Sequence, residues 1–297
     1  MTEDLSTHTS DTCAFHSDRP AWVRCTRCDR PICGDCVIPA SVGQHCPACV
    51  RSAQKRIRSI RPDRHAAATF VIIGVTVAAY VLNLILGDRL VEWFLVQPYL
   101  VLVENEWWRL VTPVLVHGPI YHILFNMYAL FVIGRVLEEG QGTRRFLIVY
   151  FVSAISASTA SIAVPVFLHP RTTLPIQTDL GWLVPGGSIG ASGAVFGLFG
   201  ALALLLWKRR HQPSARSALT QIVVLILINL AIGFTIGGID NNAHIGGMIG
   251  GIAIAVGFDL ADTKSAWQRR SWIGIAVVLA VCAVVLFVAR ARLLAIA

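Results

Sequence analysis

Seven uncharged or nearly uncharged runs dominate this sequence, and each is close to the ~20 residues that a helix needs to cross a bilayer. They cover residues 66–87, 119–137, 146–168, 189–207, 218–238, 243–261 and 272–289. Only 14% of the residues are charged, whereas soluble domains carry roughly 25%. The sequence therefore predicts an all-α polytopic membrane protein with seven spans.

The net charge of +8 reflects clusters of Lys and Arg beside the spans. The clusters precede the first span and follow the second, fourth and sixth: Lys55, Arg56, Arg58, Arg61 and Arg64; Arg144 and Arg145; Lys208, Arg209, Arg210 and Arg216; Lys264, Arg269 and Arg270. If the spans alternate in direction, all four clusters lie on one side, and the positive-inside rule makes that side cytoplasmic. We therefore expect a cell-membrane protein with a cytoplasmic N-terminus and no nucleic-acid partner. Arg290 and Arg292, after the seventh span, conflict with this pattern.

Seven of the eight cysteines lie before residue 50. Together with one histidine they form four pairs, each with a two-residue gap: Cys13 with His16, Cys25 with Cys28, Cys33 with Cys36, and Cys46 with Cys49. This gap lets both side chains of one turn reach a single tetrahedral zinc, so eight ligands predict two structural zinc ions. Disulfides are disfavoured because a cytoplasmic segment is kept reduced. His45 is an alternative ligand or a surface histidine.

The first fifty residues are polar, so no cleavable signal peptide is expected, and the first span is expected to direct insertion. The order of the pairs resembles B-box or cross-braced zinc fingers, in which alternate pairs share a metal. Sequential pairing stays open as the alternative. We expect residues 1–50 to form a zinc-binding domain for a cytoplasmic protein partner, and the basic linker at 51–65 to lie along the anionic leaflet.

Polar residues open three of the spans. If the N-terminus is inside, the second, fourth and sixth spans all start at the outer face, carrying His122 and Asn126, Ser192, and His244 respectively. Polar groups at membrane depth are costly, so they indicate a functional site. A serine becomes a nucleophile when a neutral imidazole accepts its proton, which makes His244 the candidate base for Ser192. Asn126, His122 and the backbone N–H of Ser192 are candidate donors to an oxyanion.

Small residues at four-residue spacing let membrane helices approach closely. Gly193 and Gly197 have this spacing in the fourth span, and Gly246 and Gly250 have it in the sixth. We expect these glycines to bring Ser192 within reach of His244.

These residues resemble the motifs of rhomboid intramembrane serine proteases. The resemblance covers residues 66–262 and rests on Trp108-Arg109, His122 with Asn126, Gly190-Ala191-Ser192-Gly193, and Ala243-His244-Ile245-Gly246-Gly247. It implies a six-helix core with one additional helix at 263–297, and a Ser192–His244 dyad that needs no cofactor. The implied substrates are single-span membrane proteins, cut at or just inside the outer membrane face.

The resemblance also assigns supporting residues. Asn126, His122 and the Ser192 amide would hold the oxyanion, and Gly134 with Glu138 would form a structural site. Phe196 would pack on the catalytic histidine, and His117 would bind cavity water or serve the structure. A catalytically silent scaffold that binds transmembrane helices is the alternative function, although it usually lacks the serine or histidine. A proton-coupled transporter is disfavoured, because the ionisable residues gather at one face.

Overall fold

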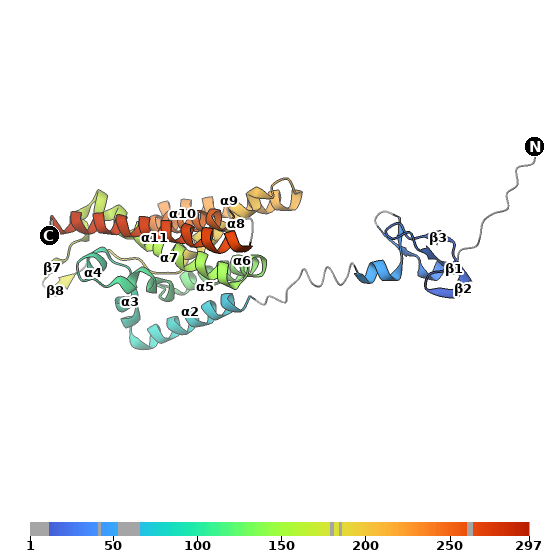
Figure 1. Ribbon diagram of the computed structural model, residues 1–297. Coiled ribbons are helices and arrows are strands. Elements are labelled where there is room, and N and C mark those ends of the chain that lie inside the picture. Colours follow the sequence, from blue (N-terminus) through green and yellow to red (C-terminus); the bar gives the residue numbers. More distant parts are fainter. Residues whose placement is uncertain are drawn as a thin grey trace, which may run out of the picture. The chain divides into compact units, whose positions relative to one another are not determined.

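The computed structural model describes residues 12–40, 43–52, 66–178, 181–183, 186–259 and 264–296. The chain divides into two units, of which the first ends at Arg64 and the second begins at His65 (Figure 1). Most of the linker predicted at 51–65 lies outside the described residues, as does the domain boundary predicted at residues 262 and 263. Each unit is therefore considered by itself.

The N-terminal unit consists of three small antiparallel hairpins and short helical turns. Its elements are β1 (Thr12–Cys13), β2 (His16–Pro20), β3 (Val23–Arg24), β4 (Pro31–Ile32), η1 (Gly34–Cys36), β5 (Ile38–Pro39), β6 (Gln44–His45) and a helical turn at 47–52. Apart from Ile32, its buried core residues are cysteines. A unit of this size has too little apolar core to be stable alone, so its cysteines need a further stabilising role.

The second unit contains a helix at each of the seven predicted spans (Figure 1). The spans are α2 (Ala67–Leu86), α5 (Ile120–Ala129) continuing through the π-helical η4 (Leu130–Gly134) into α6 (Arg135–Gln141), α7 (Thr143–Leu168), α8 (Ser192–Lys208), α9 (Pro213–Thr235), α10 (Asn241–Asp259) and α11 (Lys264–Leu294). Short elements connect them: α3 (Arg89–Phe94), α4 (Pro98–Leu102), η2 (Trp107–Leu110), η3 (Thr112–Leu115), η5 (Pro170–Thr173), β7 (Ile176–Thr178) and β8 (Gly181–Leu183). The predicted all-α polytopic fold is confirmed, and α11 starts eight residues earlier than its predicted span.

Five of these spans are long and apolar enough to cross a membrane, judged over the described residues. The exceptions are α8, with 17 residues, and the glycine-rich α10. Both helices pack with α7 in the middle of the unit. They contact protein more than lipid, so a long, strongly apolar surface is not required of them.

The outer helices have the opposite character. In the apolar 18-residue stretch of α7, 61% of the stretch is buried, whereas the corresponding stretch of α9 is only 11% buried. Exposed apolar side chains cover α2 and α9, among them Val71, Ile85, Leu227 and Phe234. Apolar patches this large would be a liability in water, so they identify the lipid-facing surface.

The connection between α2 and α5, residues 88–119, folds into α3, α4, η2 and η3. Arg109 holds it together: the side chain is 5% exposed and donates to the carbonyls of Glu92 (2.8 Å) and Leu95 (3.0 Å) and to the Glu106 carboxylate (2.5 Å). The Trp108 indole N–H donates to the carbonyl of Trp93 (3.3 Å). The Trp108-Arg109 motif is therefore the internal support of this first loop.

At the other end of the bundle, the buried carboxylate of Glu138 joins three helices. It accepts hydrogen bonds from the backbone N–H groups of Ala68 (3.0 Å) and Thr69 (2.8 Å) and from the hydroxyls of Thr69 (2.8 Å) and Thr143 (2.7 Å). The N–H groups at the start of α2 have no partners within that helix. Gly134 lies under this contact, since a Cβ added there would approach the Thr69 side chain to 3.0 Å.

We expect Glu138→Ala to lower the free energy of unfolding in detergent by about 1–3 kcal/mol for each buried donor left without a partner. Glu139→Ala is the matched control. The Glu139 carboxylate is 46% exposed and pairs with Arg135 at 3.4 Å. An exposed ion pair of this kind is worth at most about 1 kcal/mol. Equal losses of stability in a denaturant titration of the two variants would contradict this role for Glu138.

Candidate active site and candidate metal centres

Ser192 and His244 lie side by side on adjacent helices. Ser192 is the first residue of α8, and His244 lies in the first turn of α10. Nε2 of His244 is 2.9 Å from Oγ of Ser192, and His244 is 6% exposed. Both residues lie at one end of the bundle, as expected from the alternating spans, and they are within hydrogen-bonding distance.

The imidazole of His244 is oriented mainly by packing. The Phe196 ring, one turn after Ser192, stacks on it with a centroid separation of 4.1 Å and an interplanar angle of 9°. Among the described residues, Nδ1 of His244 is buried and has no hydrogen-bond partner. The residue expected to pack on the histidine is therefore in place, and the pair has no third polar member in the described part of the chain.

Glycines set the distance between α8 and α10. A Cβ added at Gly247 would overlap the carbonyl oxygen of Gly193, and one at Gly251 would overlap that of Gly197. The prediction that Gly246 and Gly250 make this contact is wrong. Both face α7 instead, where an added Cβ would meet Ala160 and Ser156. Spacing alone cannot distinguish the two pairs, because Gly246–Gly250 and Gly247–Gly251 have the same period on different sides of one helix.

We expect Gly247→Ala to lower the free energy of unfolding by about 1–3 kcal/mol, because the new methyl group must displace the α8 backbone. Gly74→Ala on α2 is the matched control, since nothing lies within 4 Å of the added Cβ, and its higher helix propensity makes it neutral or slightly stabilising. The two unfolding transitions in detergent provide the comparison. A Gly247→Ala protein as stable as the Gly74→Ala protein would contradict the close contact.

His117 and His122 border the segment that leads to Ser192. The N–H of Ala191 donates to Nε2 of His117 (3.3 Å), whose ring lies edge-on to His122 at a centroid distance of 5.1 Å. A Cβ added at Gly190 would lie 2.8 Å from the His122 ring, and Gly190 has a φ of +111°, so glycine is needed here for both space and backbone geometry. Of the two roles considered for His117, this contact is the structural one.

Asn126 lies one turn after His122, and it is 6% exposed. Its side-chain amide donates to the His122 carbonyl (2.9 Å) on the same helix. An amide nitrogen carries two hydrogens, so one donor is left over. The N–H of Ser192 also has no carbonyl partner within its helix, because α8 begins at this residue.

Asp240 is a supporting residue that sequence reasoning missed. One carboxylate oxygen accepts from the N–H of Ala243 (3.0 Å) and caps α10, and the other accepts from the hydroxyl of Ser161 on α7. The backbone carbonyl of Asp240 accepts from the N–H of His244 (3.1 Å). An Asp just before a helical run is an N-cap signal, and that signal could have found it.

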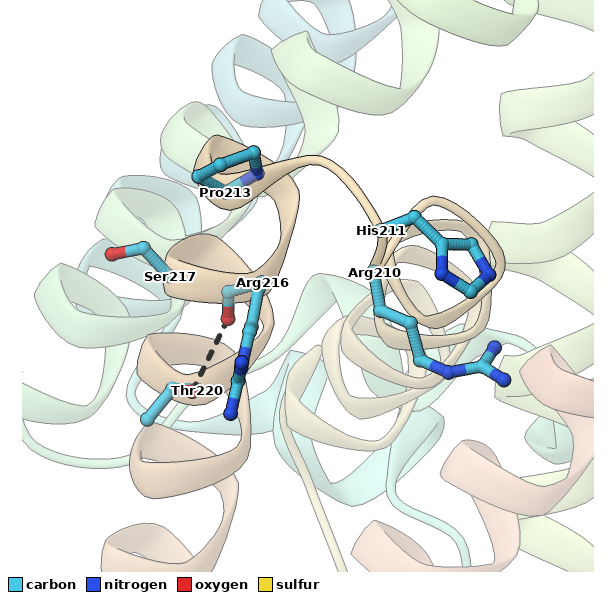
Figure 2. A pocket seen from close by; sticks show the side chains of 6 residues that line it. All are labelled: Arg210, His211, Pro213, Arg216, Ser217 and Thr220. Atoms are coloured by element: carbon cyan, nitrogen blue, oxygen red, sulfur yellow. Dashed lines mark hydrogen bonds between the residues drawn. The ribbon is translucent and has the colours of Figure 1, made fainter.

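A cavity of about 380 Å³ lies at the opposite end of α8 from Ser192. Figure 2 shows Arg210 and His211 on the turn after α8, and Arg216, Ser217 and Thr220 on the first turns of α9. The Arg210 guanidinium lies 4.3 Å from the Trp207 ring centroid. Arg210 and Arg216 line this cavity and no Asp or Glu does, so the cavity is basic.

The N-terminal unit contains two candidate metal centres. The eight predicted ligands separate into Cys13, His16, Cys33 and Cys36, and into Cys25, Cys28, Cys46 and Cys49, with ligand atoms within 4.8 Å of one another in each group. This is the alternate pairing of cross-braced fingers rather than the sequential one. His45 belongs to neither group.

The interatomic distances fit a tetrahedral ion. Nδ1 of His16 is 3.3 Å from the sulfurs of Cys33 and Cys36 and 3.9 Å from that of Cys13, and the Cys28 and Cys46 sulfurs are 3.7 Å apart. Zinc bonds of about 2.3 Å to sulfur and 2.0–2.1 Å to nitrogen place tetrahedral ligands about 3.5–3.8 Å apart. A disulfide needs about 2.05 Å, and all the cysteines are free.

Local electrostatics also fit a cation. Burial opposes ionisation of Cys13, but hydrogen bonds from the backbone of Cys33 and Phe15 and from the side chains of Cys33 and His16 together outweigh it and lower the pKa of this thiol to about 6. Burial and the neighbouring thiols of Cys13 and Cys33 raise the pKa of Cys36 to about 12. A divalent cation would offset the repulsion that keeps the second thiol protonated, and the chemistry of this donor set suits zinc.

Comparison with known proteins assigns the second unit. Residues 104–259, more than half of the chain, match the rhomboid domain family. The chain belongs to the rhomboid family. Rhomboid protease GluP of Bacillus subtilis is 36% identical over 168 residues, which are 57% of this chain and 29% of GluP. RHOMBOID-like protein 6, mitochondrial, of Arabidopsis thaliana is 35% identical over 56% of this chain and 48% of its own length. Rhomboid protease AarA of Providencia stuartii is 28% identical over 67% of this chain and 74% of AarA.

The chain thus spans less than half of the length of the first two relatives. The rhomboid match contains Ser192, His244, His122 and Asn126 but leaves out the metal clusters, α2 and α11. The contributions of the parts outside this match have to be argued from the chain's own contacts.

Proposed function

We propose that this rhomboid is an intramembrane serine endopeptidase that cleaves single-span membrane proteins, with Ser192 as nucleophile and His244 as general base. The 2.9 Å contact between Oγ and Nε2 carries the proposal. The chain's similarity to GluP and AarA, which are both rhomboid proteases, supports it. A peptide bond in a stable helix is hydrogen-bonded and shielded, so we expect substrates with small or helix-breaking residues near the cleavage site.

In the first chemical step Oγ of Ser192 attacks the scissile carbonyl carbon while Nε2 of His244 accepts the hydroxyl proton. His244 then returns this proton to the leaving amine, and an ester to Ser192 remains. A water molecule, deprotonated by His244, hydrolyses the ester and restores both side chains. Nε2 must start unprotonated, so the imidazole proton sits on Nδ1, and the stacked Phe196 ring holds the imidazole in place of a third polar residue.

The attacked carbonyl oxygen becomes negative, and three groups are proposed to stabilise it. The backbone N–H of Ser192 is free of helical hydrogen bonding, the Asn126 amide has a second N–H, and His122 lies beside the serine segment at Gly190. Each well-placed donor is worth about 2.7–4 kcal/mol of transition-state stabilisation. His117 would act indirectly by holding the Ala191 N–H and with it the start of α8.

We further propose that the N-terminal unit is cytoplasmic and that the dyad opens toward the extracytoplasmic face. The basic cavity in Figure 2 supports this orientation, because Arg210 and Arg216 would meet an anionic inner leaflet. The N-terminal unit would hold two structural zinc ions and bind a cytoplasmic protein partner. Its cross-braced ligand pattern is similar to that of B-box fingers.

The experiment that tests the protease against the scaffold uses the full chain reconstituted in vesicles with a fluorescently tagged single-span model substrate. A protease releases two fragments and turns over repeatedly. A scaffold instead retains the intact substrate in a stable complex, and that result, for several substrates with small residues near the outer end, would overturn the proposed function.

A further inference from the structure

The last helix makes specific contacts close to the serine site, although it lies outside the residues that match the family. Its outer half contributes to a hydrophobic cluster separate from the main core. The cluster contains Leu286, Ala289 and Leu293 from α11, Val96, Val101 and Leu102 from the first loop, and Ile162 and Val166 from α7. The helix therefore packs against the first loop as well as against the bundle.

Two arginines hold the C-terminal end of α11 to the first loop and to α7. Arg290 donates to the Asn105 side chain of the first loop (2.6 Å), and Arg292 donates to the carbonyls of Val166 and Phe167 (both 3.2 Å). Those carbonyls belong to the last turn of α7, where they have no helical partner and favour a cation. These contacts give a physical reason for the two cations that conflict with the positive-inside pattern.

The first loop is in turn bonded to residues 186–190, the serine segment, which precedes Ser192. Val96 and Ser188 form an antiparallel bridge, in which each N–H donates to the other's carbonyl (3.0 and 2.8 Å), and the N–H of Gly190 donates to the Pro113 carbonyl (2.9 Å). Val96 belongs through its side chain to the cluster that contains the last helix, and it is bonded through its backbone to Ser188.

The serine segment has little internal structure to fix its course. Gly186, Gly187 and Gly190 all have positive φ values, of 75°, 142° and 111°, and glycine has the largest conformational freedom of any residue. A Cβ added at Gly187 would lie 2.9 Å from the Leu95 side chain. The position of this segment, which ends two residues before Ser192, therefore depends on the first loop beside it.

We infer that α11 is a positioning element for Ser192: Leu286, Ala289, Leu293 and Arg290 fix the first loop, and the first loop fixes the serine segment through Val96 and Ser188. None of these residues touches the reacting atoms. The inference rests on the proposed function of Ser192, and it assigns to the additional helix a part in the geometry of the site.

The first test compares two adjacent leucines of α11 in the full chain. Leu293 is 0% exposed within the cluster and Leu294 is 50% exposed. With a fluorophosphonate probe, we expect Leu293→Ala to reduce the maximal rate of Ser192 labelling roughly 2- to 30-fold, the range in which such couplings fall, with little change in the probe concentration for half-maximal rate. Leu294→Ala should label like the parent. Equal rates for the two variants would overturn the inference.

The second test uses the Arg290–Asn105 contact, which lies at the surface. Asn105 has a φ of +63°, so Asn105→Gly removes the acceptor without straining the backbone, and Asn105→Asp retains an acceptor. Arg290→Ala, Asn105→Gly and the double variant should reduce the rate of Ser192 labelling to the same extent. Asn105→Asp should be labelled at the parental rate. Additive losses, or no loss, would show that this contact does not position the site.

Hydrogen exchange tests the link from α11 to residues 186–190 separately from the proposed protease activity. Amides of residues 186–190 should exchange faster in Leu293→Ala and Arg290→Ala than in the parent, even if the parent proves to cleave nothing. If the parent is inactive but this exchange rises, the proposed function fails and the mechanical link stands. If exchange at 186–190 is unchanged, the link itself is wrong.

Discussion

Ser192→Ala is expected to abolish cleavage of a single-span model substrate, with kcat lowered by at least about 10⁴-fold. The variant loses the only hydroxyl that lies 2.9 Å from Nε2 of His244 among the described residues, so no covalent ester can form. His244→Ala should be equally inactive, because the serine hydroxyl then has no base. The double variant should be no worse than either single one, since residues of one catalytic unit act non-additively.

The matched control is Ser217→Ala. Ser217 lies on α9 beside the basic cavity, at the opposite end of α8 from Ser192, and its removal should leave the rate unchanged. Circular dichroism and unfolding in detergent would verify that all variants fold. A folded Ser192→Ala protein that cleaves the substrate at the parental rate would exclude the proposed chemistry.

Removal of zinc from the full chain is expected to unfold its N-terminal unit. Metal analysis should return about two zinc ions per chain, and structural zinc contributes about 10–16 kcal/mol of apparent folding free energy in small fingers, more than this small core can replace. After treatment with a strong chelator, we expect rapid proteolysis within residues 12–52. Substrate cleavage should persist, because the proposed steps use Ser192 and His244 and no metal ligand.

Cys25→Ser separates this effect from general loss of a buried thiol. The variant removes one ligand of the second cluster and should retain about one zinc per chain. Cys282→Ser is its control, because Cys282 is equally a buried free cysteine but lies on α11, outside both clusters. Full zinc content in Cys25→Ser, or a chain that stays protease-resistant at 12–52 without metal, would contradict the two-zinc assignment.

Much of this fold follows from local rules in the sequence. Long apolar runs predict helices because every backbone group must be satisfied inside a bilayer, and all seven runs correspond to helices. The same rules place Ser192 and His244 at one depth, because alternating spans start at alternating faces. Cysteine pairs predict metal ligands, and the resemblance to cross-braced fingers anticipated the alternate grouping that the structure contains.

Contacts between distant segments were not predictable in the same way. The choice between Gly246–Gly250 and Gly247–Gly251 depends on how α10 is rotated about its axis, which two neighbouring helices determine together. Arg290 and Arg292 conflicted with the charge pattern until their partners, Asn105 and the last carbonyls of α7, were known. The bridge between Val96 and Ser188 involves only backbone atoms, so the types of the two residues do not predict it.

The most direct test of the central claim is to map the adduct formed by a fluorophosphonate on the full chain. The reagent loses fluoride when a serine oxygen attacks its phosphorus, so it reports an activated hydroxyl without needing the physiological substrate. We predict a single adduct, on Ser192 in the peptide that begins α8, and its loss in His244→Ala. An adduct on a different residue, or labelling of Ser192 that persists at the parental rate without His244, would contradict the account.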